Sequence, residues 1–340
     1  MRDVWEMGRV RGDVGVDEIH KEELSLDYND RMDPLAHALA GTLIARTHPS
    51  RSKGLVTACL IGAVIPDIDI VLTFWGKDNY LLEHRGFTHS LMGLLPMSFL
   101  AACLAYLWVR QREDKASFWS LWALALAGVV SHILLDLCTS WGTMVLWPNR
   151  TRFAWDELFI VDPWYWGLLA IPLLLSFFWK DRRVAICVAG MAVAMAYHGM
   201  AWFNHRQALR VAEEDRPQAW KAAFPQPLSP FRWSVFDRGD GLLKNARVDF
   251  LKGLKPLEWE EWKEPALTPE VRLAMDSPRG KNLFWFARVP MWSEEKLPDG
   301  SFQVSFWDMR FNTYLTKQRL SKNFGGVFTI KDGQVVESRF

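Results

Sequence analysis

Long apolar runs, separated by short charged segments, dominate the chain between about residues 34 and 203. Six runs can be distinguished, at residues 34–46, 55–75, 90–109, 118–138, 163–179 and 184–203. The first is short, whereas each of the others approaches the roughly 20 apolar residues that a helix needs to cross a bilayer. A core helix of a soluble protein would carry a polar stripe, but residues 91–109 and 184–203 are apolar on nearly every side. The pattern therefore predicts a polytopic bundle of transmembrane helices.

Prolines mark local structure in the first two runs. Asp33 followed by Pro34 is typical of a helix start, with a capping carboxylate and a proline at the first helical position. Pro66 lies inside the second run and is expected to interrupt its helix, because proline has no amide hydrogen to donate. Asp67 and Asp69, which follow it, can then turn inward near the membrane boundary.

After residue 205 the pattern becomes that of a soluble, β-rich segment. Residues 207–215 are expected to continue the last helix, until prolines break it at Pro217, Pro225, Pro227 and Pro230. Two sets of alternating apolar residues predict strands, namely Phe231, Trp233 and Val235, and Phe302, Val304 and Phe306. Hairpin turns are expected at Asp240-Gly241, Asp299-Gly300 and Asp332-Gly333.

The predicted fold class is therefore mainly α, a polytopic transmembrane helical bundle with a C-terminal soluble β-rich domain. We expect residues 1–31 to form a polar N-terminal extension, residues 32–205 the multi-spanning membrane domain, and residues 206–340 the β-rich domain.

Composition adds little to this picture. Half of the residues are apolar, and the net charge of +1 gives no reason to expect a nucleic-acid partner. The four cysteines lie in separate apolar runs without CxxC spacing, so we expect buried and inert thiols at Cys59, Cys103, Cys138 and Cys187.

Basic residues concentrate in alternate loops. The three basic groups are Arg46, Arg51 and Lys53, then Arg110, Arg112 and Lys115, and then Lys180, Arg182 and Arg183. The positive-inside rule places these loops in the cytoplasm. The other loops and the C-terminal domain then face outward, provided that the short first segment crosses the membrane or returns consistently.

Residues that can bind metal recur where the apolar runs meet the predicted outer face. Asp67 and Asp69 lie in an apolar run, where each charge costs roughly 2.5–3.5 kcal/mol unless it is paired or binds metal. The simpler alternative is a pair of interfacial acids at the end of a span.

A second group is the segment from His84 to Ser90, which contains Arg85 and His89. Gly86 allows a turn that brings the two histidines toward one point, and Thr88 is expected to cap a helix that begins at His89. Arg85 cannot bind a metal but can hold an oxyanion. The alternatives are an exposed His89 at a helix start and an ion pair of Arg85 with a nearby acid.

A third group is His132 and Asp136, which the i,i+4 spacing places on one face of an apolar helix. The two could simply hydrogen-bond each other, or His132 could be a satisfied core histidine. His37 adds another imidazole one turn into the first helix. Under the predicted topology all of these groups lie at the same membrane face, so we expect one site.

The predicted metal ligands are His37, Asp67, His89, His132 and Asp136, and the predicted catalytic residues are Asp69, His84 and Arg85. Mixed imidazole and carboxylate donors suit a divalent metal, which we expect to be Zn, with Mn or Fe as alternatives. These groups are more than one tetrahedral ion needs, so either two metals bind or some side chains orient the others.

Four segments together resemble the YdjM-type family of membrane-bound metal-dependent hydrolases, over roughly residues 32–205 and the proline-rich stretch near Pro227. They are Met32-Asp33-Pro34-Leu35-Ala36-His37, Pro66-Asp67-Ile68-Asp69, His84-Arg85-Gly86-Phe87-Thr88-His89-Ser90 and Ser131-His132-Ile133-Leu134-Leu135-Asp136. The resemblance implies a multi-pass protein of the bacterial inner membrane with metal-dependent hydrolase activity. It does not supply a substrate.

The leading hypothesis is hydrolysis of a lipid or lipid-linked phosphoester, with membrane lipid as the partner, because the site is expected at the lipid–water boundary. One alternative is a non-catalytic, metal-stabilised scaffold that presents the C-terminal domain. Another is a transporter, although its site would be expected near the membrane midplane. An intramembrane protease is a second enzymatic alternative, but the chain lacks an HExxH motif. The oligomeric state is not predicted.

Overall fold

The computed structural model describes residues 33–112, 114–215, 220–253, 257–313 and 325–339. The chain divides into two compact units, Met1–Arg31 and Met32–Phe340. All described residues belong to the second unit. The predicted N-terminal extension and Pro217 lie outside the described residues.

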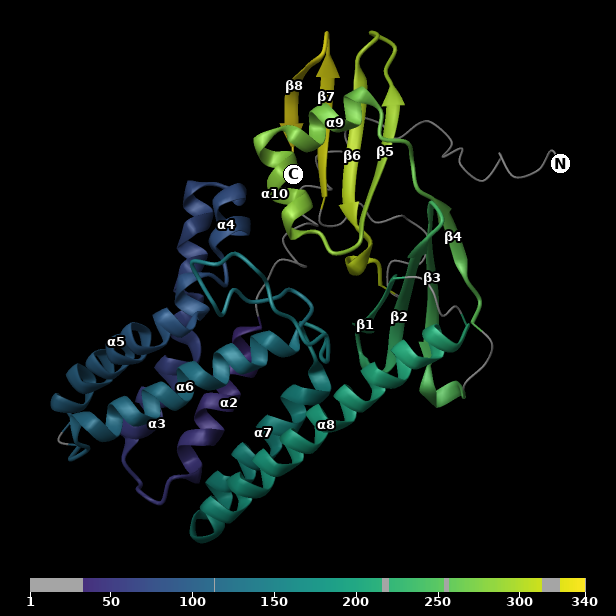
Figure 1. The fold of residues 1–340 in the computed structure, drawn as a ribbon. Helices are drawn as coiled ribbons and strands as arrows, with labels where there is room; N and C mark the ends of the chain where they lie inside the picture. The colour runs from purple at the N-terminus through teal and green to yellow at the C-terminus, as the bar shows by residue number, and fades with distance from the viewer. Residues whose placement is uncertain (1–32, 113, 216–219, 254–256, 314–324, 340) are drawn as a thin grey trace. The chain divides into compact units, whose positions relative to one another are not determined.

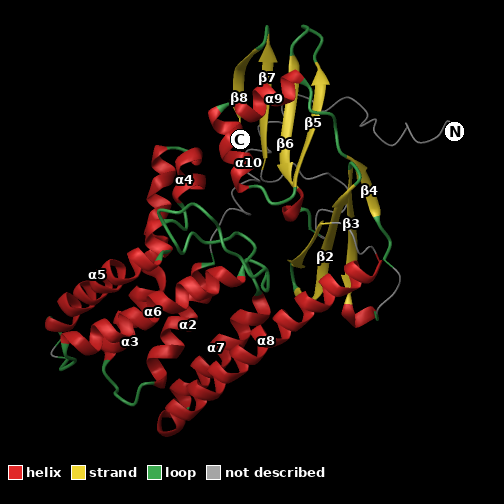
Figure 2. Ribbon diagram, in the orientation of Figure 1, coloured by secondary structure: helices red, strands yellow, loops and turns green. Residues whose placement is uncertain are grey.

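Between residues 33 and 215 the described residues are mainly helical, apart from a long loop at residues 139–162 (Figures 1 and 2). The α-helices are α2 (Pro34–Thr47), α3 (Lys53–Val64), α4 (Lys77–Glu83), α5 (Leu91–Arg110), α6 (Phe118–Cys138), α7 (Pro163–Phe178) and α8 (Arg183–Asp215). Short 3-10 segments are η2 (Ile65–Trp75), η3 (Phe87–His89) and η4 (Lys180–Arg182). Every predicted helix is present, and α4 is an addition.

Four helical stretches are long and apolar enough to cross a bilayer: Lys53–Trp75, Leu91–Arg110, Phe118–Cys138 and Lys180–Asp215. The helix Pro163–Phe178 is apolar but shorter. These stretches confirm the predicted membrane bundle. At 33 residues, α8 is about 50 Å long, well above the roughly 30 Å of a hydrocarbon core. It runs without a break across the predicted boundary between residues 205 and 206, and its last turns pack against β1 and β2.

The start of α2 and the end of α3 lie where the prolines predicted them, but the predicted start of α5 needs a correction. The Asp33 carboxylate accepts from the amide of Ala36 at 3.0 Å, as predicted, and α3 ends at Val64, just before Pro66. Thr88, however, does not cap α5. That helix begins at Leu91, and the Ser90 hydroxyl accepts from Gly93 N at 3.0 Å.

Small residues allow α3 and α6 to approach closely. A Cβ at Gly62 would lie 2.2 Å from the carbonyl oxygen of Ala125, and one at Gly128 would lie 2.3 Å from that of Cys59. Backbone contact through glycine and alanine is typical of helix pairs in membranes. It brings the C-terminal end of α3 beside the last two turns of α6.

The C-terminal region contains two four-stranded antiparallel sheets, each with its strands in sequence order. The strands are β1 (Trp220–Gln226), β2 (Ser229–Gly239), β3 (Leu242–Asp249), β4 (Glu260–Lys263), β5 (Pro290–Lys296), β6 (Phe302–Asp308), β7 (Gly325–Lys331) and β8 (Gln334–Arg339). Two helices that were not predicted, α9 (Pro269–Asp276) and α10 (Pro278–Phe286), precede the second sheet.

The predicted turns are present. Asp240 and Gly241 both have positive φ, at 55° and 71°, and so do Asp332 and Gly333, at 50° and 73°. Two successive positive values match the hairpin turns predicted at these two places, whereas Asp299-Gly300 connects β5 and β6 with positive φ at the glycine alone, at 85°. α8 ends at Asp215, as predicted, but the prolines need one correction, because Pro225 and Pro230 lie within strands. Pro225 adjoins a shift in the pairing of β1 with β2, where a missing amide hydrogen is tolerated.

Candidate metal centre

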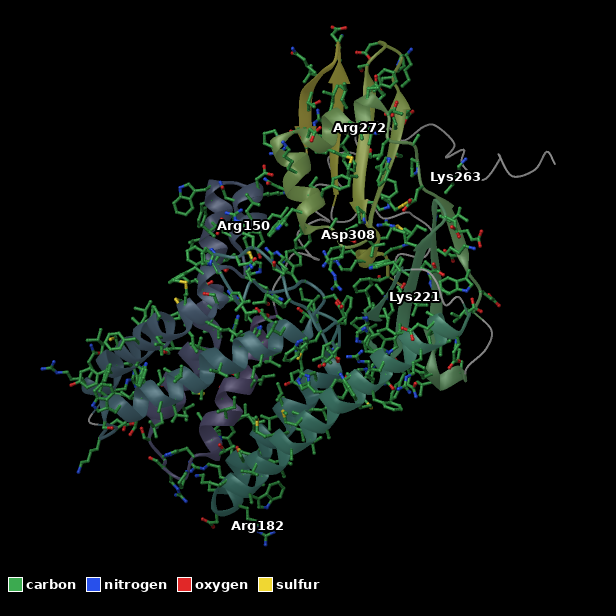
Figure 3. The ribbon with its side chains drawn as sticks, viewed as in Figure 1. Arg150, Arg182, Lys221, Lys263, Arg272 and Asp308 are labelled. Atoms are coloured by element: carbon green, nitrogen blue, oxygen red, sulfur yellow. The ribbon has the colours of Figure 1, made fainter. Side chains whose placement is uncertain are left out.

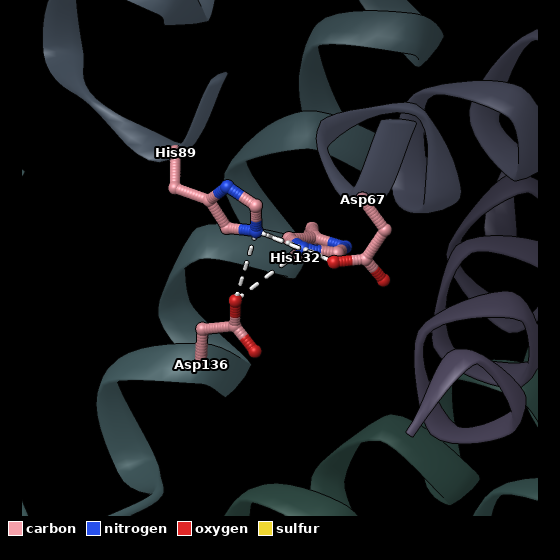
Figure 4. A group of neighbouring side chains, drawn as sticks. All are labelled: Asp67, His89, His132 and Asp136. Carbon is pink, nitrogen blue, oxygen red and sulfur yellow. Dashed lines mark hydrogen bonds and ion pairs between the residues drawn. The ribbon is translucent and has the colours of Figure 1, made fainter. Parts of the chain in front are cut away.

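Four predicted ligands come together at one end of the helices (Figure 4). Asp67 lies on η2, His89 ends η3, and His132 and Asp136 occupy the last two turns of α6. One ligand atom from each lies within 4.8 Å of the others. His89 and His132 are 0% exposed and Asp136 is 1% exposed, so these groups face one another and not solvent.

The distances describe a compact group. His89 Nε2 lies 3.0 Å from His132 Nε2, 3.4 Å from Asp67 Oδ1 and 3.2 Å from Asp136 Oδ2. His132 Nε2 lies 3.3 Å from Asp67 Oδ1 and 3.4 Å from Asp136 Oδ2. A tetrahedral ion with bonds of about 2.0–2.1 Å separates its ligand atoms by about 3.3–3.4 Å. An octahedral ion with similar bonds separates adjacent ligand atoms by about 3.0 Å. Either geometry fits with little movement.

Hydrogen bonds fix which nitrogen of each imidazole can bind a metal. His132 Nδ1 lies 2.7 Å from the carbonyl oxygen of Ala63, which can only accept, so Nδ1 carries the hydrogen. The Thr88 hydroxyl donates to Asp69 Oδ2 at 3.0 Å, so its oxygen accepts from His89 Nδ1 at 2.9 Å. When both rings are neutral, each Nε2 atom therefore carries a lone pair, and the two lone pairs face each other. A proton on one, or a metal ion between them, removes the repulsion.

Asp69 and His84 stand behind His89, outside the group of four. Asp69 Oδ1 lies 2.9 Å from His84 Nδ1, and Oδ2 lies 3.4 Å from His89 Nδ1. Asp69 Oδ2 also accepts from the amide of Arg85 at 3.1 Å. This arrangement fixes the His89 ring, as a carboxylate behind a metal-binding histidine commonly does.

Electrostatics favour a positive charge in the group. Burial acts to lower the pKa of His89, but contacts with Asp136, Asp67 and Asp69 outweigh it and hold this pKa well above its usual range. Burial also lowers the pKa of His84, and there the opposing effect of Asp69 is too weak to reverse it. The carboxylates thus attract one cation to His89, and a proton and a metal compete for that place.

Arg85 and His37 contact the other oxygen of Asp136. Arg85 Nη2 lies 2.9 Å and His37 Nε2 lies 3.4 Å from Asp136 Oδ1. Arg85 Nη1 also donates to the carbonyl of Asp136 and to the Thr139 hydroxyl, at 3.2 and 2.8 Å. The φ of Arg85 is +60°, a conformation that side chains other than glycine seldom adopt and that often accompanies function.

A cavity of about 30 Å³ adjoins this side of Asp136. Its lining includes His37, Arg85, Asp136, Thr139 and Tyr165. Among the described residues, Arg85 Nε and His37 Nδ1 are buried without a hydrogen-bond partner. A volume of this size holds about one water molecule.

The structure thus brings all eight predicted residues into one neighbourhood and separates them into layers. Asp67, His89, His132 and Asp136 form the centre, Asp69 and His84 lie behind His89, and Arg85 and His37 lie beside Asp136. The sequence reasoning missed the carbonyl of Ala63 and the hydroxyls of Thr88 and Thr139 as partners. Thr88 could have been found, since it directly precedes His89, but a backbone carbonyl has no sequence signal.

The basic loops lie at the opposite helix ends from the metal centre. Arg46 is in the last turn of α2 and Arg110 in the last turn of α5, whereas His37 and His89 are near the starts of those helices. Arg183 Nη2 donates to the carbonyls of residues 48–50, so two basic loops touch each other. Figure 3 shows Arg182 at the turn between α7 and α8.

A family model described as "YdjM inner membrane protein" matches residues 32–208. The protein named "Uncharacterized protein YfhP" from Bacillus subtilis (strain 168) is 33% identical over 111 residues, which are 33% of each chain. The "Inner membrane protein YdjM" of Escherichia coli (strain K12) is 34% identical over 111 residues, 29% of this chain and 52% of that protein.

The "Inner membrane protein YbcI" of Escherichia coli (strain K12) is 28% identical over 159 residues, 45% of this chain and 85% of that protein. The chain therefore spans a third to about half of the length of the first two relatives. No solved structure matches it.

Proposed function

The chain belongs to the family of YdjM inner membrane proteins, and we propose that it is a metal-dependent hydrolase acting on a lipid or lipid-linked phosphoester. The observation that carries the proposal is the pair of facing Nε2 atoms of His89 and His132, 3.0 Å apart, with two carboxylates in reach of both. We expect Zn²⁺ there, with Mn²⁺ or Fe²⁺ as alternatives.

A divalent ion at this position would supply Lewis acidity and a strong nucleophile at neutral pH. The chain's own residues then have definite tasks. His37 Nε2 faces Asp136 Oδ1, so its Nδ1 carries a lone pair beside the cavity and can accept a proton from water. Arg85 Nε, with no partner among the described residues, can donate to an oxyanion in the same cavity.

The surroundings of Asp67 support a lipid substrate. The same short segment places Asp67 and Asp69 toward the centre and leaves Ile68 and Ile70 half exposed. Phe74 and Trp75, at the end of this segment, are 87% and 68% exposed. Apolar and aromatic side chains exposed at the end of a membrane helix suit a bilayer interface. A lipid head group at that level would lie close to the metal ligands.

The orientation in the membrane is part of the proposal. Basic residues at the helix ends opposite the centre favour a cytoplasmic position for those ends. The metal centre and the C-terminal region would then act at the outer face of the inner membrane.

The test is a hydrolysis screen on full-length protein in detergent. The protein is loaded in turn with Zn²⁺, Mn²⁺ or Fe²⁺ and incubated with phospholipids and a polyprenyl phosphoester, and released phosphate or head group is measured. We expect activity with at least one metal. His132→Gln should lose both metal and activity. His48→Gln, at the end of α2 away from the metal centre, should keep both. A fully metal-loaded protein that hydrolyses no member of the panel contradicts the proposal.

One observation favours a second function, a metal-stabilised scaffold without catalysis. Four protein ligands would fill the coordination sphere of a tetrahedral ion, and a coordination sphere without an open position is typical of structural zinc. Catalysis would need a metal ion with five or six ligands, or a carboxylate that leaves the metal so that water or substrate can bind. Zn²⁺ that raises the melting temperature without any hydrolysis would support the scaffold.

A further inference from the structure

A second group of possible metal ligands lies near the first and was not predicted. Cys138 ends α6, Glu157 lies in the following loop, and His198 lies in the middle of α8. One ligand atom from each lies within 4.8 Å of the other two. The sequence pattern indicated only an inert thiol at Cys138, because its partners are far away along the chain.

The fold brings the three together through backbone pairing. The amides of Glu157 and Leu158 both donate to the carbonyl of Cys138, at 2.8 and 2.9 Å, and Thr139 pairs with Leu158 in a parallel bridge. The loop after α6 therefore returns to the helix end and sets Glu157 beside Cys138. Helix α8 packs along α7, and the His198 ring meets the edge of Tyr165 at 5.0 Å between centroids.

The polar atoms of this group are largely buried and only loosely paired. Cys138 is 5% and Glu157 9% exposed, and His198 Nδ1 is buried with no hydrogen-bond partner in the described part of the chain. The closest approach of His198 Nδ1 to Glu157 is 3.8 Å, too long for a hydrogen bond. The group thus holds a buried carboxylate to which its histidine neighbour makes no hydrogen bond, and a buried polar group without one is costly. With a divalent ion, one carboxylate and one thiolate would give a neutral group.

We propose that Cys138, Glu157 and His198 form a second metal site, with a sulfur, an oxygen and a nitrogen ligand. Thiolate and imidazole together favour Zn²⁺ among the common divalent ions. Binding forms a metal–sulfur bond, and the thiol proton leaves to solvent. The thiol also gives up its contact with the carbonyl of Leu134, which is 3.2 Å away. The ligand atoms must move from within 4.8 Å to about 3.3–3.6 Å apart, which side-chain rotation can supply.

The sulfur ligand makes this site distinguishable from the first. Only a thiolate gives Co²⁺ a near-ultraviolet charge-transfer band, and the first centre has no sulfur. Full-length protein in detergent, titrated with Co²⁺ alone, should bind two ions per chain and show this band. Cys138→Ser and His198→Ala should each bind one ion and lose the band. Cys187→Ser changes a cysteine of α8 that is also buried but lies outside both groups, and it should keep two ions and the band.

The first centre provides an internal control. Asp67→Asn should lose one ion and keep the band. Loss of metal from the first centre can therefore be told apart from loss of metal from the second. His198→Ala removes a partly buried side chain and serves if Cys138→Ser does not fold. A saturated wild type without the band, or a band that persists in both variants, would overturn the proposal.

Discussion

Asp67 and Asp136 are both carboxylates of the first centre, but they have different neighbours. Asp136 is paired with Arg85, whereas the ion pairs of Asp67 within the described residues are with His89 and His132 alone. Replacing Asp136 leaves a buried arginine uncompensated, which is strongly destabilising in itself. Asp67 is therefore the better place to test metal binding separately from folding.

We predict that Asp67→Asn weakens metal binding at the first centre by at least about tenfold. The melting temperature of the metal-free protein should fall less than in Asp136→Asn, because no arginine is left unpaired. Mass spectrometry measures the metal content, and thermal unfolding measures the melting temperature. Asp78→Asn, an acid paired with Arg279 outside the centre, is the control and should keep the metal. Unchanged metal in Asp67→Asn would remove Asp67 from the ligands.

Arg85→Lys separates charge from hydrogen-bond geometry. Lysine keeps a positive charge near Asp136 but lacks the planar fork and the Nε donor beside the cavity. We predict normal metal content and hydrolysis reduced by about 10²–10³-fold, as for loss of one oxyanion donor. Turnover on the substrate found in the screen gives the readout. Loss of metal in Arg85→Lys would show instead that Arg85 acts by holding Asp136 in place.

At this scale the sequence predicted which residues gather, but it counted His37 among the ligands, whereas His37 lies beside Asp136 and outside the group of four. His132 and Asp136 were recognisable from their spacing, and Asp67 and Asp69 from their charge in an apolar run. Only coordinates show that Asp69 faces the far nitrogen of His89 while Asp67 faces the near one. The sequence analysis had assigned Asp67 to the ligands and Asp69 to the catalytic residues, but the spacing alone did not show which nitrogen of His89 each would face.

Among the helices, the contact between α3 and α6 positions the centre. Gly62 touches the backbone of Ala125, and a rotamer change cannot relieve a clash with backbone. We predict that Gly62→Ala lowers the free energy of unfolding by about 1–3 kcal/mol, the usual cost of overpacking, and reduces metal content as Asp67 moves from His132.

Gly199 of α8 is the matched control, because a Cβ there meets nothing within 4 Å. Alanine is the better helix former by about 1 kcal/mol, so Gly199→Ala should be neutral or stabilising. Thermal unfolding of both variants in the same detergent shows whether each substitution lowers or raises stability. Equal effects at the two glycines would mean that the close approach of α3 and α6 does not control stability.

The apolar runs predicted the long helices well because membrane helices must satisfy their backbone internally and be apolar throughout. The short helix α4 was missed, since its seven residues form no long periodic pattern. For α9 a signal was present: Thr268 before Pro269 is an N-cap followed by proline, and the Thr268 hydroxyl accepts from Val271 N at 3.2 Å.

For the whole molecule, the orientation proposed from the basic loops can be tested directly. A reporter that is active only outside the cytoplasm should work when fused after Asp215 and fail when fused after Arg112. A cytoplasmic reporter should give the opposite pattern. The reason is the excess of arginine and lysine at the helix ends away from the metal centre. Cytoplasmic activity of the fusion after Asp215 would reverse the orientation and leave the centre itself unchanged.

The contacts between the helical part and the sheets could not be predicted. Arg279 of α10 pairs with Asp78 of α4 at 2.8 Å, although 201 positions separate them. Arg288 binds both oxygens of Asp156 at 2.6 and 2.8 Å, next to Glu157 of the second group. Charged residues in loops have many possible partners in a sequence, and only the packed chain selects one.

The burial of the first centre has a consequence for exchange rates. His89 and His132 have no exposed surface, and the side chain of Asp67 is the most exposed of the four, at 11%. We therefore expect that an ion held by them leaves when the segment carrying Asp67 swings away. The rate of metal loss to a chelator should therefore stop rising once the chelator is in excess. That plateau would measure how often η2 opens, a property of the protein's motion and not of its affinity for the ion.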